Sequence, residues 1–334
     1  MASRSGASGF KPDDLSLPWP KIAVVGAGAV GGYFGGMLAR AGAPVTLIGR
    51  SPFVQAVKKN GLLLDTVQFK ETVRVEASTE LAAVRSAEVV LFCVKTTDTV
   101  STARALKPLL PREAILVSLQ NGVQNAEQIR SASGFEAASA VVYVAASVPQ
   151  PGQVKHVGRG DLVVGPPGVR TERIAALFEK AGVPCRISDN IEGELWTKLI
   201  WNCALNAISA LGRARYGQIA ASEDARKLVE NVVNEVIGVA NAARIQLPGV
   251  EDSKAALAGA LRIATQMSGA ISSTGQDLMR GKRTEIDALN GFIAKRGAEL
   301  GVPTPVNDAL CTLVKLAEQE EVPAQSVTNA ARQG

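Results

Sequence analysis

The 334-residue chain is poor in several of the residue types that carry chemistry. It has one histidine and four cysteines, and aromatic residues make up only 4% of it. The cysteines are scattered and lack the paired spacing of metal sites or disulfide frameworks; they are Cys93, Cys185, Cys203 and Cys311. Three of them lie in apolar surroundings, which is typical of small buried thiols in a reducing compartment. We therefore expect a cytoplasmic protein that binds no metal.

Long apolar runs and long runs of one charge are also missing. No stretch approaches the length of a membrane span, and residues 1–20 lack the apolar segment of a signal peptide and are interpreted as a flexible leader. The net charge of +5 comes from 36 basic and 31 acidic residues without an aromatic-rich basic patch. We expect neither membrane nor nucleic acid as a partner, whereas anionic small molecules fit this charge. The length and the 46% hydrophobic content indicate two domains with packed cores.

A glycine-rich motif follows the first apolar strand, which we predict over residues 21–25. The motif is Gly26-Ala27-Gly28-Ala29-Val30-Gly31, and a helix of small residues then runs to Gly42. In a dinucleotide-binding turn, Gly26 would permit the tight turn and Gly28 would let the backbone approach the pyrophosphate. Gly31 would bring the helix close to the strand, and the N–H groups of the helix N-terminus would meet the phosphates. A GxGxxG motif alone could be an ordinary turn, but the strand–turn–helix order favours dinucleotide binding.

The end of the next predicted strand, residues 44–48, indicates which dinucleotide. NAD sites usually place an acidic residue here for the ribose hydroxyls, yet no Asp or Glu occurs from Leu15 to Leu64. Arg50 stands here instead, and its planar guanidinium suits a 2′-phosphate. The alternative is an ordinary surface arginine. We predict NADPH/NADP+ as the cofactor.

Two further apolar runs, residues 88–95 and 114–122, end in polar residues. Such runs suit parallel strands covered on both faces, and ligands gather at the carboxyl ends of these strands. Lys95 and Asn121 would lie at that edge, where together they are better interpreted as site residues than as ordinary loop residues. Further strands over 137–148, 153–164 and 185–187 and a helix over 171–181 complete a predicted Rossmann NADP-binding domain, residues 21–189.

The most unusual segment is a predicted helix around residues 194–206. Lys198, Asn202 and Asn206 lie one turn apart on one side, and nearly every other position is apolar. An ammonium group in such a helix needs partners or loses its proton. The lone His156 sits in an alternating strand and is interpreted as structural, so the usual proton donor of many dehydrogenases is missing. Our hypothesis is that Lys198 faces a reaction cleft and takes that role.

Helices dominate from residue 190, and we predict a helical substrate-binding and dimerisation domain over 190–334. The periodicity indicates helices over 223–245, 253–267, 285–300 and 305–318. Between the second and third of these, Ser273 precedes a short helix and Glu285 opens the longer one. Simple capping would explain both residues if the segment stood alone. The apolar C-terminal helices are compatible with a homodimer.

These motifs together resemble the ketopantoate reductase (2-dehydropantoate 2-reductase) family, from residue 21 to about residue 320. The glycine motif is generic, whereas the lysine–asparagine helix and the segment from Ser272-Ser273 to Asn290-Gly291 are specific to the family; Val94-Lys95 and Gln120-Asn121-Gly122 also match. The resemblance implies an N-terminal Rossmann domain and an all-helical C-terminal domain with the active site between them. It also implies NADPH-dependent reduction of a 2-oxo acid to a 2-hydroxy acid in pantothenate biosynthesis.

The resemblance further assigns roles by position. Lys198 matches the family's general acid, and Glu285 matches the acid near that lysine and the nicotinamide ribose. Asn121 matches the residue between cofactor and substrate, and Lys95 matches a cofactor contact. The substrate-binding positions are matched by Asn202, Asn206 and Ser273. A positioned ammonium suits this reaction, because it can stabilise the growing alkoxide and supply its proton.

One position departs from the family pattern. A further substrate asparagine, counted without gaps from Lys198, falls at Tyr216, with Arg213 and Arg215 close by. A bulkier phenol and two arginines suggest a larger or more anionic substrate, so a reductase of a different 2-oxo acid or related carbonyl is the alternative. A third hypothesis is a non-catalytic NADP-binding sensor. It predicts that the pattern of Lys198, Asn202 and Asn206 has been lost, but the pattern is intact.

Overall fold

The computed structural model describes residues 18–319, so residues 1–17 of the predicted leader and the final residues 320–334 lie outside the described part. The chain forms two compact units. Among the described residues, the first comprises residues 18–198 and Ile245–Pro248, and the second comprises Leu199–Arg244 and residues 249–319. The division falls within helix α6 (Ile191–Leu211), and the predicted domain boundary after residue 189 stays a prediction.

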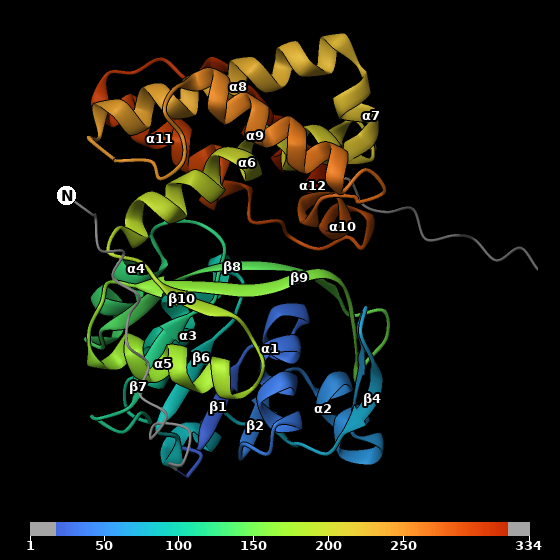
Figure 1. Ribbon diagram of the computed structural model, residues 1–334, viewed down its shortest axis with the longest axis vertical. Helices are drawn as coiled ribbons and strands as arrows, with labels where there is room; N and C mark the ends of the chain where they lie inside the picture. Colours follow the sequence, from blue (N-terminus) through green and yellow to red (C-terminus); the bar gives the residue numbers. More distant parts are fainter. Residues whose placement is uncertain (1–17, 320–334) are drawn as a thin grey trace, which may run out of the picture. The chain divides into compact units, whose positions relative to one another are not determined.

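The first unit is built on one ten-stranded sheet, counted within residues 18–319 (Figure 1). Its strands are β1 (Ile22–Val25), β2 (Val45–Ile48), β3 (Leu62–Asp65), β4 (Lys70–Val73), β5 (Glu76–Ser78), β6 (Val89–Phe92), β7 (Ile115–Ser118), β8 (Ala137–Ser147), β9 (Gln153–Gly165) and β10 (Cys185–Ile187). The order is β4-β3-β9-β8-β7-β6-β1-β2-β5, with β10 paired to β9. The strands predicted over residues 137–148, 153–164 and 185–187 are therefore present as β8, β9 and β10.

The central strands are the parallel, buried ones that the apolar runs predicted. β1 pairs in parallel with both β2 and β6, and β6 pairs in parallel with β7. All four residues of β1, β6 and β7 are buried. The sheet is nevertheless mixed, because β8 and β9 are antiparallel and the short connection between them cannot form a parallel crossover.

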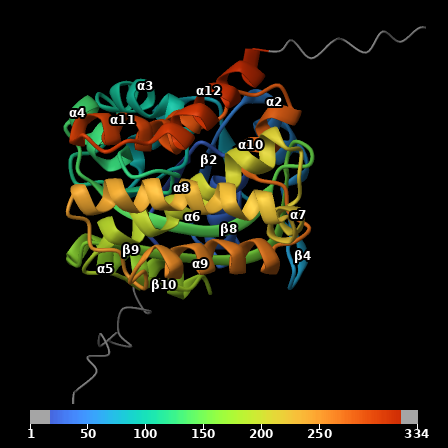
Figure 2. The ribbon, with the colours of Figure 1, turned by 90° about the horizontal axis from the view of Figure 1, so that it is seen from above.

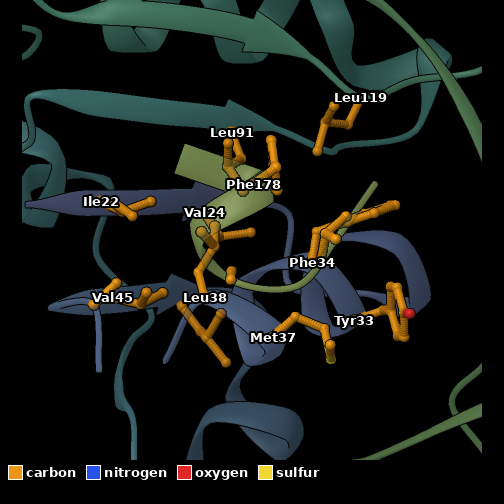
Figure 3. Close-up of a cluster of buried hydrophobic side chains, with 14 of the residues drawn as sticks. Ile22, Val24, Tyr33, Phe34, Met37, Leu38, Val45, Leu91, Leu119 and Phe178 are labelled. Carbon is orange, nitrogen blue, oxygen red and sulfur yellow. The ribbon is translucent and has the colours of Figure 1, made fainter. Parts of the chain in front are cut away.

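Helices cover both faces of this sheet. They are α1 (Ala29–Arg40), α2 (Ser51–Asn60), α3 (Thr99–Leu106), α4 (Asn125–Ser133) and α5 (Val169–Lys180), with short 3₁₀ turns over Leu81–Ser86 and Thr96–Asp98. On one face, Phe34 of α1 and Phe178 of α5 pack beside Val24 of β1 (Figure 3). On the other, Leu106 of α3 and Ile129 of α4 belong to a second core cluster. Each large buried side chain contributes roughly 1.5–3 kcal/mol to folding.

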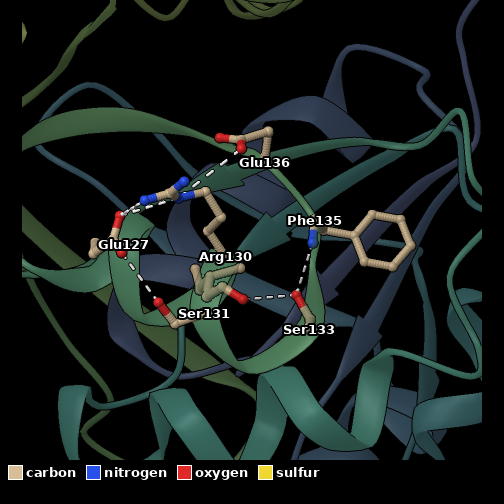
Figure 4. A network of polar contacts seen from close by, with 7 residues as sticks. Glu127, Arg130, Ser131, Ser133, Phe135 and Glu136 are labelled. Atoms are coloured by element: carbon tan, nitrogen blue, oxygen red, sulfur yellow. Dashed lines mark hydrogen bonds and ion pairs between the residues drawn. The ribbon is translucent and has the colours of Figure 1, made fainter.

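A polar network at the surface marks the end of α4 (Figure 4). Arg130 donates to the carboxylate of Glu127, and the Ser131 hydroxyl donates to the same carboxylate at 3.0 Å. The Ser133 hydroxyl donates to the Ile129 carbonyl and accepts from the amide of Phe135. The exposed ion pair adds little stability. The helix ends at Ser133 with the left-handed Gly134 as its C-cap, and three residues separate it from β8.

The second unit is helical, as predicted. After α6 come α7 (Tyr216–Ala221), α8 (Glu223–Ala242), α9 (Ser253–Gln266), α10 (Ser273–Met279), α11 (Asn290–Leu300) and α12 (Pro305–Gln319). Figure 2 shows α8 alongside α9. The apolar face of α8 is fully buried at Val229, Val232, Val233, Val236 and Val239. The predicted start of a long helix at Glu285 is wrong: a 3₁₀ turn covers Ile286–Ala288, and α11 begins only at Asn290.

Candidate active site

The glycine-rich motif forms the predicted turn between β1 and α1. Gly26 has a φ of +98°, and a Cβ there would lie 2.6 Å from the amide nitrogen of Val94. A Cβ at Gly31 would lie 2.5 Å from the Gly26 carbonyl oxygen and 2.9 Å from the Val24 side chain. At Gly28, by contrast, a Cβ would meet no atom within 4 Å. Two glycines therefore allow close packing, and the third leaves open space over the turn.

The first turn of α1 suits an anion. It contains no acidic residue, and Gly28 stands at its N-cap without a side-chain cap. The first N–H groups of a helix have no partner within the helix, so those of Ala29, Val30 and Gly31 are available to a phosphate. The open space at Gly28 and these donors fit the pyrophosphate of a dinucleotide.

Arg50 lies near this turn, at the end of β2. The amides of Gly26 and Ala27 donate to the Ile48 carbonyl at 3.0 and 2.9 Å, which ties the turn to the strand that precedes Arg50. Arg50 is exposed, and within residues 18–319 its guanidinium has no ion-pair or hydrogen-bond partner. A guanidinium beside this turn, with no partner within the described residues, is available to an anionic group.

Lys95 and Asn121 follow the neighbouring strands β6 and β7, as predicted. A buried network that the sequence did not reveal connects these strand ends. The Gln120 amide donates to the Val94 carbonyl at 3.0 Å and to the Thr99 hydroxyl at 2.7 Å. The Asn125 amide donates to the Asn121 carbonyl at 2.6 Å. The network holds the backbone next to both candidate residues, and the only sequence signal for it was the polar run that starts at Gln120.

Lys198 has the partners that a lysine in an apolar helix requires. Its Nζ donates to Asn121 Oδ1 at 3.0 Å and to the Val142 carbonyl oxygen at 2.5 Å. The Tyr143 ring centroid is 5.9 Å from the same nitrogen. The side chain is partly buried, and its neighbours Trp196, Leu199 and Ile200 are buried. The structure thus brings Lys198 and Asn121 together, and it adds a backbone carbonyl of β8 that no sequence pattern could reveal.

The two asparagines of α6 differ in their surroundings. Asn202 is partly exposed, and its side chain makes no hydrogen bond within the described residues. Asn206 is buried, and its Oδ1 accepts a hydrogen bond of 2.8 Å from the Tyr216 hydroxyl. The position that we predicted to depart from the family pattern is therefore filled by a buried phenol that contacts a predicted substrate residue.

The structure corrects the capping interpretation of the later segment. Ser272, not Ser273, is the N-cap of α10: its Oγ accepts from the Gly275 amide at 3.0 Å and donates to the Asn206 carbonyl at 2.9 Å. Ser273 is exposed. Glu285 is half-buried and precedes the 3₁₀ turn rather than a long helix. In the sequence, either of these adjacent serines could be the N-cap. Only the path of the backbone decides that Ser272 is buried at the cap and that Ser273 is exposed.

His156 has structural contacts. It is buried in β9, its ring stacks on that of Tyr33 with centroids 4.5 Å apart, and its Nε2 is 2.6 Å from the Arg159 carbonyl oxygen. Because a carbonyl only accepts, Nε2 carries the proton. Within residues 18–319, no group of three or more His, Cys, Asp or Glu side chains is placed to hold a metal ion, and no helix there is long and apolar enough to cross a membrane.

Comparison with known proteins identifies the family. Residues 22–168 match the family described as ketopantoate reductase PanE/ApbA, and residues 190–318 match its C-terminal domain. The chain belongs to the ketopantoate reductase family. It is an oxidoreductase that acts on CH–OH groups, with an N-terminal Rossmann-like domain and a helical C-terminal domain, and the family binds NADPH.

Individual relatives match this chain over nearly their whole length. The 2-dehydropantoate 2-reductase of Pyrococcus abyssi is 32% identical over 90% of this chain and 99% of its own. A crystal structure of a PanE/ApbA family ketopantoate reductase from Ralstonia eutropha JMP134 is 50% identical, has a TM-score of 0.84, and covers 89% of this chain and 98% of its own. A D-mandelate dehydrogenase solved with NADH and anilino(oxo)acetate has a TM-score of 0.82 at 26% identity, with coverage of 89% and 98%.

Proposed function

We propose that this family member reduces 2-dehydropantoate (ketopantoate) to pantoate with NADPH, as a step of pantothenate biosynthesis, and that Lys198 is the general acid. The observation that carries the proposal is the Lys198 ammonium on an apolar helix, held by Asn121 Oδ1 and the Val142 carbonyl. Both of these groups are hydrogen-bond acceptors, so the Lys198 amine donates to each of them. The whole-length similarity to 2-dehydropantoate 2-reductases supports the choice of substrate.

The residues that would hold the cofactor follow from the turn and its surroundings. The turn Gly26–Gly31 would take the pyrophosphate on its backbone N–H groups. Arg50 would pair with the 2′-phosphate, and Lys95, Asn121 and Glu285 would contribute further contacts. When bound, NADPH supplies the hydride.

The remaining residues would bind the oxo acid and stabilise the negative charge that develops on it. As the substrate carbonyl becomes an alkoxide, the Lys198 ammonium would stabilise the negative charge and donate the proton. Asn202 and Asn206, one and two turns along α6, and Ser273 would hydrogen-bond the substrate without adding charge. Glu285 is the second residue, after Lys198, that we assign to catalysis, and it contributes a carboxylate.

Purified protein mixed with NADPH and ketopantoate tests the proposal. We expect rapid loss of the near-ultraviolet absorbance of NADPH and formation of pantoate, with a much slower reaction when NADH replaces NADPH. NADPH binding without turnover of any 2-oxo acid would contradict the proposal and support a sensor.

A second candidate is the reduction of a different 2-oxo acid by the same chemistry. Two observations favour it: Tyr216 is buried against Asn206, and the structural relatives include a D-mandelate dehydrogenase. A panel of 2-oxo acids with aliphatic, hydroxylated and aromatic side chains separates the two candidates. A kcat/KM for another acid well above that for ketopantoate would favour the second.

A further inference from the structure

Tyr216 is a buried phenol for which the proposed reaction has no use. It is the first residue of α7 and is 8% exposed. Its backbone amide donates to the Ala270 carbonyl and that of Gly217 donates to the Ser268 carbonyl, both at 3.0 Å, so the backbone that carries the ring is fixed. Burial raises the pKa of Tyr216, which keeps the hydroxyl protonated and able to donate at neutral pH.

The partner of this hydroxyl is Asn206, whose own surroundings are also fixed. The Asn206 side chain is 5% exposed, and its backbone carbonyl accepts from the Ser272 hydroxyl. Its Oδ1 accepts from the Tyr216 hydroxyl at 2.8 Å, whereas within residues 18–319 its Nδ2 donates to no group.

The orientation of this amide follows from hydrogen-bond chemistry. An asparagine amide can flip and exchange its oxygen for its nitrogen. If it flipped here, the buried Tyr216 proton would face an NH₂ group and lose its acceptor, which is costly in a protein interior. The phenol therefore selects the orientation in which Oδ1 points to Tyr216 and the NH₂ group points away.

We propose that Tyr216 is a positioning residue that determines substrate specificity through Asn206, by fixing its amide so that Nδ2 offers hydrogen-bond donors to the substrate. This inference rests on the proposed function, in which Asn206 binds the oxo acid. The group that it recognises is an oxygen acceptor, either a carboxylate or a hydroxyl oxygen. A substrate that places an ammonium or another obligate donor at this point is rejected, because two donors would face each other.

A double-mutant cycle tests the coupling. The binding constant of ketopantoate to the enzyme–NADP+ complex is measured by calorimetry, together with KM and kcat, for wild type, Tyr216→Phe, Asn206→Ala and the double variant. Tyr216→Phe keeps the ring and frees the amide to flip, so we expect Kd and KM to rise up to about tenfold with a smaller change in kcat. In the Asn206→Ala background the same change has no further effect.

Two further variants sharpen the test. Asn206→Asp replaces the donor by an acceptor: if the recognised oxygen is a carboxylate, KM rises more than in Asn206→Ala, whereas a hydroxyl can turn its proton and restore binding. Tyr33→Phe, which removes a buried phenol hydroxyl in the first unit, is the matched control and leaves substrate Kd unchanged. Thermal unfolding of each variant confirms that it is folded.

The outcomes separate this inference from the proposed function. If wild type reduces ketopantoate and Tyr216→Phe binds it unchanged, or if the effect of Tyr216→Phe persists in the Asn206→Ala background, the inference alone is overturned. If wild type neither binds nor reduces any 2-oxo acid, the proposed function falls and the inference falls with it.

Discussion

Replacing Lys198 by alanine tests the proposed mechanism most directly. The variant removes the only side chain that we assign to proton donation, and general acid catalysis typically contributes about 10²–10⁴-fold. At 1.36 kcal/mol per factor of ten, the loss corresponds to roughly 3–5 kcal/mol of transition-state stabilisation. Asn121 Oδ1 and the Val142 carbonyl also lose a charged donor. We therefore expect kcat to fall by this factor, while the affinity for NADPH changes little.

The assay follows a single turnover, in which the enzyme–NADPH complex is mixed rapidly with ketopantoate and NADPH fluorescence is recorded. NADPH affinity is measured separately by fluorescence titration. Lys295→Ala, at an exposed lysine of α11, is the matched control and keeps the wild-type rate. Added methylamine should restore part of the Lys198→Ala rate, because it supplies an ammonium of the same kind. A turnover of Lys198→Ala close to that of wild type would refute the assignment.

Three further predictions concern the cofactor, the helical unit and the thiols. Arg50→Asp should weaken NADPH binding about 10–100-fold, as expected for loss of a charge-assisted contact, and should shift cofactor preference towards NADH in steady-state kinetics. Lys58→Asp, at an exposed lysine, should leave NADPH binding and cofactor preference unchanged. If Lys58→Asp weakened NADPH binding as much as Arg50→Asp, the effect would come from the overall charge and not from a contact of Arg50. The Glu235 carboxylate accepts hydrogen bonds from the backbone and side-chain nitrogens of Asn307 at the start of α12. Glu235→Ala should therefore lower the free energy of unfolding by about 2–4 kcal/mol, measured by urea titration. An unchanged urea midpoint would contradict this prediction. Burial raises the pKa of Cys185 to about 12, so the thiol stays protonated below that pH. Because the thiolate is the reactive form, iodoacetamide at pH 8 should leave Cys185 unalkylated until the protein is unfolded, as measured by mass spectrometry.

The elements of this fold could be predicted because their signals are local. An apolar strand, a GxGxxG turn and a small-residue helix are neighbours in the chain, and their order alone predicted β1, the turn and α1. The spacing of Lys198, Asn202 and Asn206 likewise needed only a helical repeat, and α6 provides it. Where the local signal was ambiguous, the prediction failed: the acidic residue Glu285 suggested a helix start, but α11 begins five residues later, at Asn290.

The sequence by itself therefore determined the fold class, the glycine-rich turn between β1 and α1, and the candidate catalytic lysine. Only the tertiary structure decided what these residues contact. The Val142 carbonyl binds Lys198 across 56 residues, and Gln120 reaches Val94 across 26. Such contacts depend on which strands are neighbours and in which register, and a backbone carbonyl carries no residue signature. The same reason explains Tyr216: in the sequence it is a departure from a pattern, and in the structure it is a buried donor that fixes the amide of Asn206.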